Sequence, residues 1–211
     1  MRDQADYLSL SPPRDVIEFP TDPILDVNGW DLLKALRLLI KGNAVVIEWL
    51  TSPIVYAGDA AFRDEALALA HKVARPDAVA RHYLHLGRRQ RRVYFNDERT
   101  IALKKIFYAL RPAIALRWLR LHPGRAVAPM HFPTLVAESD LDREIVAIVE
   151  DLLARKAVTR ELGRGPLPPP IGALIDSEFA IADDLWPARG TQQSDADRQA
   201  ADALFRRWVL R

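Results

Sequence analysis

The sequence predicts an α+β fold with a small α/β portion over residues 1–57 and a mostly α-helical domain over residues 58–211. Short apolar runs bounded by prolines, which are typical of strands, lie almost entirely before about residue 58. Beyond that point, apolar residues recur at helical spacing. The chain has 211 residues, which is enough to bury a substantial core.

Two strands and an amphipathic helix are predicted in the N-terminal portion. The first strand is expected at residues 15–19 and the second at residues 24–27, each next to prolines that interrupt regular structure. A helix begins near Asn28 or Asp31, because either side chain can cap it, and it ends at Gly42. The leucines between these positions follow the helical period.

The remainder of the chain is predicted to be a series of helices separated by proline and glycine. Pro112 lies inside one of them and is expected to kink it. Residues 163–170 contain a run of prolines that indicates a stiff connector. The helices are expected at residues 60–72, 76–92, 98–121, 141–162, 171–179 and 194–210.

The composition excludes several classes of protein. The formal net charge of +2 is too small by itself to indicate nucleic-acid binding, although the arginines are clustered locally. There is no cysteine, which excludes disulfides and thiolate metal sites. No apolar run approaches about 18 residues, so no membrane span is expected. Residues 1–6 lack the apolar stretch of a secretory signal, and we therefore expect a cytoplasmic protein.

Three sequence motifs occur in a distinctive order. They are Leu-Asp-Val-Asn-Gly-Trp-Asp-Leu at residues 25–32, Glu-Trp-Leu-Thr-Ser-Pro-Ile-Val-Tyr at 48–56 and Lys-Lys-Ile-Phe-Tyr-Ala-Leu-Arg-Pro at 104–112. With them, roughly residues 7–180 resemble the predicted nucleotidyltransferases of the DNA polymerase beta superfamily that are associated with RNA repair. The resemblance implies that the N-terminal portion is a fragment of a nucleotidyltransferase-type mixed sheet. It also implies transfer of a nucleoside monophosphate from a triphosphate to a hydroxyl group, with an RNA end as a possible acceptor.

The same resemblance suggests which residues would form the site. Members of the superfamily place a Gly-Ser dipeptide at a helix start, an Asp-x-Asp pair on a strand and a third acid on a neighbouring strand. These carboxylates hold two Mg²⁺ ions that bridge the nucleotide and the attacking hydroxyl. Asp26 best matches the third acid, which would make it a catalytic residue and a metal ligand, and Glu18 is the weaker candidate.

A second group of residues is expected to bind the nucleoside triphosphate. Lys104, Tyr108 and Arg111 are spaced so that one face of a helix would present all three, and Lys105 could replace Lys104. Cations and an aromatic ring can hold phosphates and stack on a base. The alternative interpretation is a lysine that extends along the surface beside a tyrosine packed on the core.

The chain departs from the family pattern in one respect. It contains no Gly-Ser dipeptide, and its Asp-x-Asp pairs, at residues 140–142 and 195–197, fall at predicted helix starts where acids favour the helix dipole. By the resemblance, Met1 falls just after the expected Asp-x-Asp strand. We therefore expect a truncated nucleotidyltransferase portion, arising from a misassigned start or a real truncation, that is inactive as it stands. A truncated sheet would also expose a strand edge, which favours oligomers.

The densest cationic cluster lies at the end of the helix predicted at residues 76–92 and consists of Arg88, Arg89, Arg91 and Arg92. Tyr94 and Phe95 follow it, so RNA could bind by charge and stacking, although cations at helix ends are usually solvated. These arginines support an alternative function, in which the chain is a non-catalytic relative that binds RNA or a protein.

Four other side chains have simpler expectations. Trp30 and Trp49 are expected to anchor the core. Glu48 would either pair with a nearby cation of the preceding helix or take part in the site. His82 and His85 have no third ligand beside them in the sequence, so a zinc site is not expected.

Overall fold

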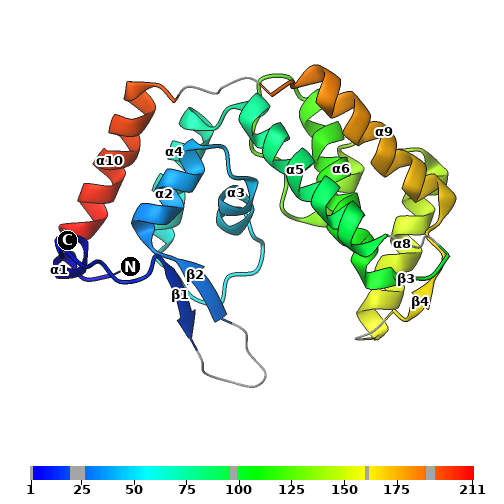
Figure 1. Ribbon diagram of the computed structural model, residues 1–211, viewed down its shortest axis with the longest axis horizontal. Coiled ribbons are helices and arrows are strands. Elements are labelled where there is room, and N and C mark those ends of the chain that lie inside the picture. The colour runs from blue at the N-terminus through cyan, green and yellow to red at the C-terminus, as the bar shows by residue number, and fades with distance from the viewer. Residues whose placement is uncertain (1, 20–26, 96–98, 160–161, 189–192) are drawn as a thin grey trace.

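The computed structural model describes residues 2–19, 27–95, 99–159, 162–188 and 193–211. It confirms the α+β class, because a small antiparallel hairpin near the N-terminus is followed by helices that pack around one another (Figure 1). None of the helices in these ranges is long and apolar enough to cross a membrane.

The N-terminal hairpin consists of β1 (Val16–Phe19) and β2 (Val27–Trp30) and follows a short helix, α1 (Gln4–Tyr7). Its register pairs Val16 with Trp30. The described part of the second strand therefore ends at residue 30, three residues after the end of the predicted range of 24–27. Residues 24–26 of that prediction lie outside the described residues, and so does Asp26. Strand pairing, which sequence periodicity does not specify, sets this register.

Two capped helices follow the hairpin. Asp31 begins α2 (Leu32–Ile40), and its side chain accepts a hydrogen bond from the backbone N–H of Lys34 at 2.8 Å. Asn43 begins α3 (Ala44–Leu50), and its side chain accepts from the first turn of that helix. Both caps satisfy backbone donors that a helix start leaves unpaired.

The C-terminal helix packs on this N-terminal portion. Figure 1 shows α10 (Asp195–Val209) beside α2 and α4 (Ala60–Val73), with the short helix α1 at its C-terminal end. Trp208 of α10 meets Phe62 of α4 edge to face, with ring centroids 5.2 Å apart. Because α4 and α10 both contact α2 (Leu32–Ile40), the packing of helices crosses the boundary expected between residues 57 and 58.

The remaining helices form a bundle centred on α5 (Pro76–Tyr94), α6 (Ile106–Leu121) and α9 (Pro169–Leu185). Gly87 allows α5 to approach α9 closely, because a Cβ atom there would lie 2.3 Å from Cζ of Phe179. The bundle is completed by α8 (Arg143–Val158), which contacts α9. The smaller elements beside it are a 3-10 turn (Leu103–Lys105), α7 (Phe132–Ala137), and the antiparallel pair β3 (Ile101–Ala102) and β4 (Arg164–Gly165).

One buried carboxylate joins two helices of the bundle. Oε1 of Glu178 on α9 accepts from Arg117 at 3.0 Å and from Arg120 at 2.9 Å, both on α6. Arg117 also donates to the carbonyl oxygen of Ser139 at 2.6 Å. A buried charge requires such partners, so this cluster fixes α9 against α6.

Several predicted boundaries were wrong. The helix predicted at 98–121 begins only at Ile106, after the two-residue strand β3, and continues through the buried Pro112. The helix predicted at 171–179 extends to Leu185, and the one predicted at 141–162 is confined to residues 143–158. Trp49 was also expected in the core, but half of it is exposed, whereas Trp30 packs against the core and its ring lies 4.4 Å from that of Trp49.

Candidate functional site

A pocket of about 290 Å³ lies where α3, α5 and α6 meet. It contains residues of the sequence motif at 48–56 and of the motif at 104–112, which are far apart in the chain. Its lining residues are Glu48, Tyr83, Leu86, Gln90, Phe107, Tyr108, Arg111 and Pro112.

Glu48, Tyr83 and Arg111 form a hydrogen-bonded group at this pocket. Oε1 of Glu48 accepts from the Tyr83 hydroxyl at 3.0 Å and from Nε of Arg111 at 2.9 Å. Burial and the neighbouring Glu48 carboxylate raise the pKa of Tyr83 well above its ordinary value, so its hydroxyl remains a donor. Glu48 thus pairs with Arg111, which lies 63 positions along the chain, and not with a cation of α2.

Arg111 is held by several other acceptors as well. Its Nη1 donates to the carbonyl oxygen of Met130 at 2.9 Å, and its Nη2 donates to the carbonyl oxygen of Pro129 at 3.2 Å. Its side chain is only 18% exposed. These bonds use most of the guanidinium donors, so Arg111 ties α3 and the loop before α7 to α6.

Lys105 lies between two tyrosines at the start of α6. Its Nζ is 4.3 Å from the ring centroid of Tyr94 and 4.4 Å from that of Tyr108, a cation–π arrangement. Tyr108 is 46% exposed, which does not fit the alternative of a tyrosine packed on the core. Lys104 lies in the 3-10 turn that runs directly into α6, whereas Tyr108 and Arg111 lie within that helix.

The two lysines occupy an electrostatically unfavourable position. Lys105 is the N-cap of α6 and Lys104 precedes it, whereas cations are favoured at the opposite end of a helix dipole. An anion bound there would be stabilised by the lysines and by the dipole together. This end of α6 can therefore hold phosphate groups one turn away from the pocket beside Tyr108.

The four arginines between residues 88 and 92 of α5 divide into two pairs. Arg88 donates to Asp183 of α9 at 2.9 Å, and Arg91 pairs with Asp176 of the same helix at 3.0 Å. Hydrogen bonds from Arg88 and Arg81 lower the pKa of Asp183, as expected for a stabilised carboxylate. Arg89 and Arg92 are exposed, and neither forms an ion pair within the described ranges.

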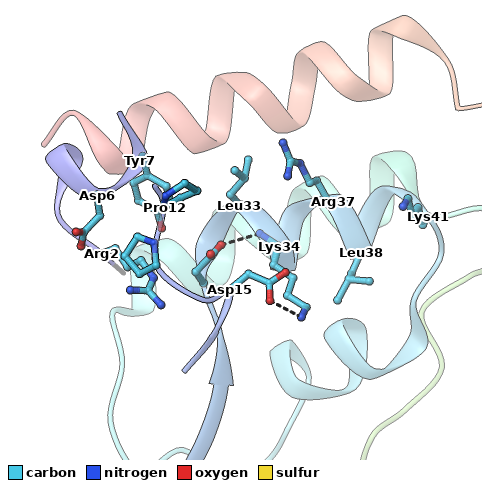
Figure 2. A pocket seen from close by; sticks show the side chains of 12 residues that line it. Arg2, Asp6, Tyr7, Pro12, Asp15, Leu33, Lys34, Arg37, Leu38 and Lys41 are labelled. Carbon is cyan, nitrogen blue, oxygen red and sulfur yellow. Dashed lines mark hydrogen bonds and ion pairs between the residues drawn. The ribbon is translucent and has the colours of Figure 1, made fainter. Parts of the chain in front are cut away.

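A larger pocket, of about 580 Å³, lies between α1, the segment before β1, and α2. Asp15 and Asp31 sit at neighbouring strand ends there, and the backbone N–H of Asp31 donates to the carbonyl oxygen of Asp15 at 3.0 Å. Figure 2 shows the Lys34 side chain pointing to Asp15, and the two form an ion pair at 2.9 Å. Arg37 lies on a later turn of α2, and Lys41 is its C-cap residue. The acids are thus engaged in the cap of α2 and in an ion pair.

The described residues do not fit a magnesium site. No group of three acidic or histidine side chains in the described ranges is placed to hold an ion. Glu18 is exposed and pairs with Arg14 at 3.6 Å. Asp26, the predicted metal ligand, lies outside the described residues, and the side chains within them support no catalytic step through a metal ion.

The Asp-x-Asp pairs lie at helix starts, as expected. Asp142 is the N-cap residue of α8, and Asp140 precedes it with a positive φ of 46°. Asp195 and Asp197 occupy the first turn of α10, where the N-cap side chain of Ser194 accepts from the backbone N–H of Asp197. These positions suit acids electrostatically.

Sequence reasoning missed Gln90 and the acidic partners on α9. Gln90 stands within the arginine cluster, and an amide among cations was the signal that could have distinguished it. Asp176 and Asp183 lie 85 and 95 positions from their arginines, a pairing that no local pattern shows.

A family model described as RlaP, the RNA repair pathway DNA polymerase beta family, matches residues 1–207. The chain belongs to this family. The matched range includes all three sequence motifs. The uncharacterized protein YcgL of Bacillus subtilis (strain 168) is 37% identical over 156 residues. That match covers 74% of this chain and 59% of YcgL, so the chain matches less than two thirds of this relative. No solved structure matches the chain.

Proposed function

We propose that this RlaP-family chain forms the nucleotide- and RNA-holding part of a nucleotidyltransferase. The reaction would transfer a nucleoside monophosphate from a nucleoside triphosphate to a hydroxyl group, with an RNA end as the acceptor and with release of pyrophosphate. Family membership supports nucleotidyltransferase-like chemistry. The observation that supports nucleotide binding is the pair of lysines at the start of α6, beside the exposed Tyr108 and the pocket.

The triphosphate would bind at the N-terminal end of α6. Lys104 and Lys105 supply positive charge there, and the helix dipole adds to it. Cations at the start of a helix oppose the local electrostatic preference, and residues that violate such a preference often mark a functional site. Transfer would then depend mainly on positioning and on neutralising the charge of the phosphates.

The base would bind one turn further along α6. Tyr108 lies in the pocket wall and is exposed enough to stack on a ring, and Phe107 and Leu86 provide apolar surface. Arg111 was expected to contact the nucleotide directly. Because its donors bind Glu48 and the 129–130 backbone, its proposed contribution is to hold the pocket wall in place.

Nucleotide binding can be tested by titrating the chain with ATP, CTP, GTP and UTP in a calorimeter. We expect Lys105→Ala and Tyr108→Ala each to weaken binding by about tenfold, since each removes a contact of roughly 1–2 kcal/mol. Tyr56→Ala is a matched control, because Tyr56 is 95% exposed and lies in neither pocket. Unchanged affinity in both α6 variants would refute this assignment of the pocket.

Transfer itself is expected to require more than these 211 residues. They contain no Gly-Ser dipeptide and no Asp-x-Asp pair outside the helix starts, so we propose that the chain alone does not transfer nucleotides. The test is incubation with labelled nucleoside triphosphates and RNA in the presence of Mg²⁺ or Mn²⁺. Robust transfer that is lost in Asp26→Asn would contradict the proposal and would assign the metal-binding role to that residue.

A second candidate function is RNA binding without catalysis, and the exposed Arg89 and Arg92 favour it. Phosphate contacts make affinity depend on salt, and for a single strand the slope falls by about 0.7 for each contact removed. We expect Arg89→Ala and Arg92→Ala each to reduce that slope for single-stranded RNA. Arg88→Ala and Arg91→Ala serve as matched charge controls with a smaller effect, because those arginines are paired with α9. Equal effects of all four variants would show that the pairing does not matter.

A further inference from the structure

The pocket between α3, α5 and α6 contains a hydrogen-bond acceptor with a fixed position. Tyr83 and Arg111 both donate to Oε1 of Glu48, which holds the carboxylate in one orientation. Its Oε2 accepts no hydrogen bond from the described residues. The side chain is 12% exposed, and Glu48 lines the pocket, so this oxygen is available to a ligand from that side.

A second polar group of the pocket is the carboxamide of Gln90. It is half-buried in the pocket wall, and within the described ranges it forms no hydrogen bond. Such an amide is open to a hydrogen bond with a ligand or with solvent in the pocket. Because the amide can rotate, Gln90 can donate to or accept from a ligand that another group has already oriented.

We propose that Glu48 and Gln90 read the edge of the nucleobase and that the pocket selects bases carrying an exocyclic amine. This inference rests on the proposed nucleotide binding and adds its specificity. Adenine, cytosine and guanine carry such an amine, whereas uracil and hypoxanthine have a carbonyl or a hydrogen at the equivalent position.

The selectivity follows from the chemistry of the fixed acceptor. A carboxylate oxygen accepts hydrogen bonds and repels a carbonyl oxygen placed against it. A ligand without the matching donor leaves a buried polar group of the site unpaired, so it binds more weakly. The resulting difference in affinity is larger than the difference that an apolar pocket wall can produce. Gln90 does not set the preference but adds a second hydrogen bond to the base. Glu48 is therefore the specificity-determining residue, and Gln90 strengthens its effect.

Matched ligand pairs test the inference with the whole chain. CTP carries an amine where UTP has a carbonyl group. GTP carries an amine that inosine triphosphate lacks, and ATP carries an amine that purine riboside triphosphate lacks. We expect the amine-bearing member of at least one pair to bind about tenfold more tightly, as the loss of one hydrogen bond to a charged group predicts. Glu48→Gln should reduce that ratio to about one. Because this change weakens the tie to Arg111, folding is checked by circular dichroism.

A second variant keeps the test decisive if Glu48→Gln does not fold. Gln90→Leu is expected to lower the affinity for the preferred nucleotide several-fold while the chain stays folded. Gln199→Leu is the matched control, because Gln199 is an exposed glutamine of α10 far along the chain from the pocket. Nucleotide binding with equal affinities within every pair, or an unchanged affinity in Gln90→Leu, would overturn this inference and leave the proposed function standing. No binding of any nucleotide by the unaltered chain would overturn both.

Discussion

The carboxylate of Glu178 allows the effect of a single substitution on stability to be calculated. Its side chain is 3% exposed and accepts from Arg117 and Arg120, which are 23% and 29% exposed. Removing one partner of a buried ion pair costs about 3–5 kcal/mol, because the opposite charge is left uncompensated. After the substitution, Arg117 still donates a hydrogen bond to the carbonyl oxygen of Ser139, and both arginines are partly exposed to solvent. We therefore expect Glu178→Ala to lower the free energy of unfolding by about 3 kcal/mol, the lower end of that range.

Urea denaturation followed by circular dichroism measures this loss, with the slope of the transition checked for each variant. Glu178→Gln keeps an acceptor and loses the charge, so it should cost less than Glu178→Ala. Glu18→Ala is the matched control, because Glu18 is 57% exposed and its pair with Arg14 should contribute at most about 1 kcal/mol. If Glu178→Ala is no more destabilising than Glu18→Ala, the reasoning about the buried cluster is refuted.

Two further predictions concern α5. Burial and the charge of a neighbouring histidine lower the pKa of His82 from its ordinary value of 6.5, and its Nδ1 accepts from the backbone N–H of Ala44 at 3.3 Å. At acidic pH the unfolded chain therefore binds more protons than the folded chain, so the free energy of unfolding should fall as the pH drops below about 6.5. His82→Asn should flatten this pH dependence, which denaturation curves from about pH 7.5 to about pH 5 measure. A Cβ at Gly87 would lie 2.3 Å from Phe179, so Gly87→Ala should cost about 1–3 kcal/mol in the same assay. Gly58→Ala, where no atom lies within 4 Å, should not show this loss, and equal effects would argue against the close approach of α5 and α9.

The sequence was a good guide where local chemistry decides the structure. Asp31 begins α2 and Ser194 begins α10 because their side chains accept from the first turn, which is visible as a short-range pattern. The strand at Val16–Phe19 was also predicted, since prolines border an apolar run. Element types that depend on a few neighbouring residues were therefore largely correct.

Pairings between distant segments could not be predicted. Glu48 had several possible cations nearby in the sequence, yet it binds Arg111, and only the packing of α3 on the bundle decides this. Trp49 looked like a core residue by its size, but half of its surface is exposed. The two-residue strand at Ile101–Ala102 is too short for any period to appear, so a helix was predicted across it. Which arginines of α5 are neutralised depended likewise on acids of α9.

The position of α10 affects the order in which the polypeptide can fold during translation. Leu204 and Trp208 of this helix are buried against α2 and α4, which are synthesised more than a hundred residues earlier. At ribosomal speeds of about 5–20 residues per second, roughly 6–30 s pass after α2 and α4 are synthesised before α10 follows. During that interval the apolar surface of α2 and α4 that α10 later covers is exposed, which is the kind of surface that a holding chaperone binds.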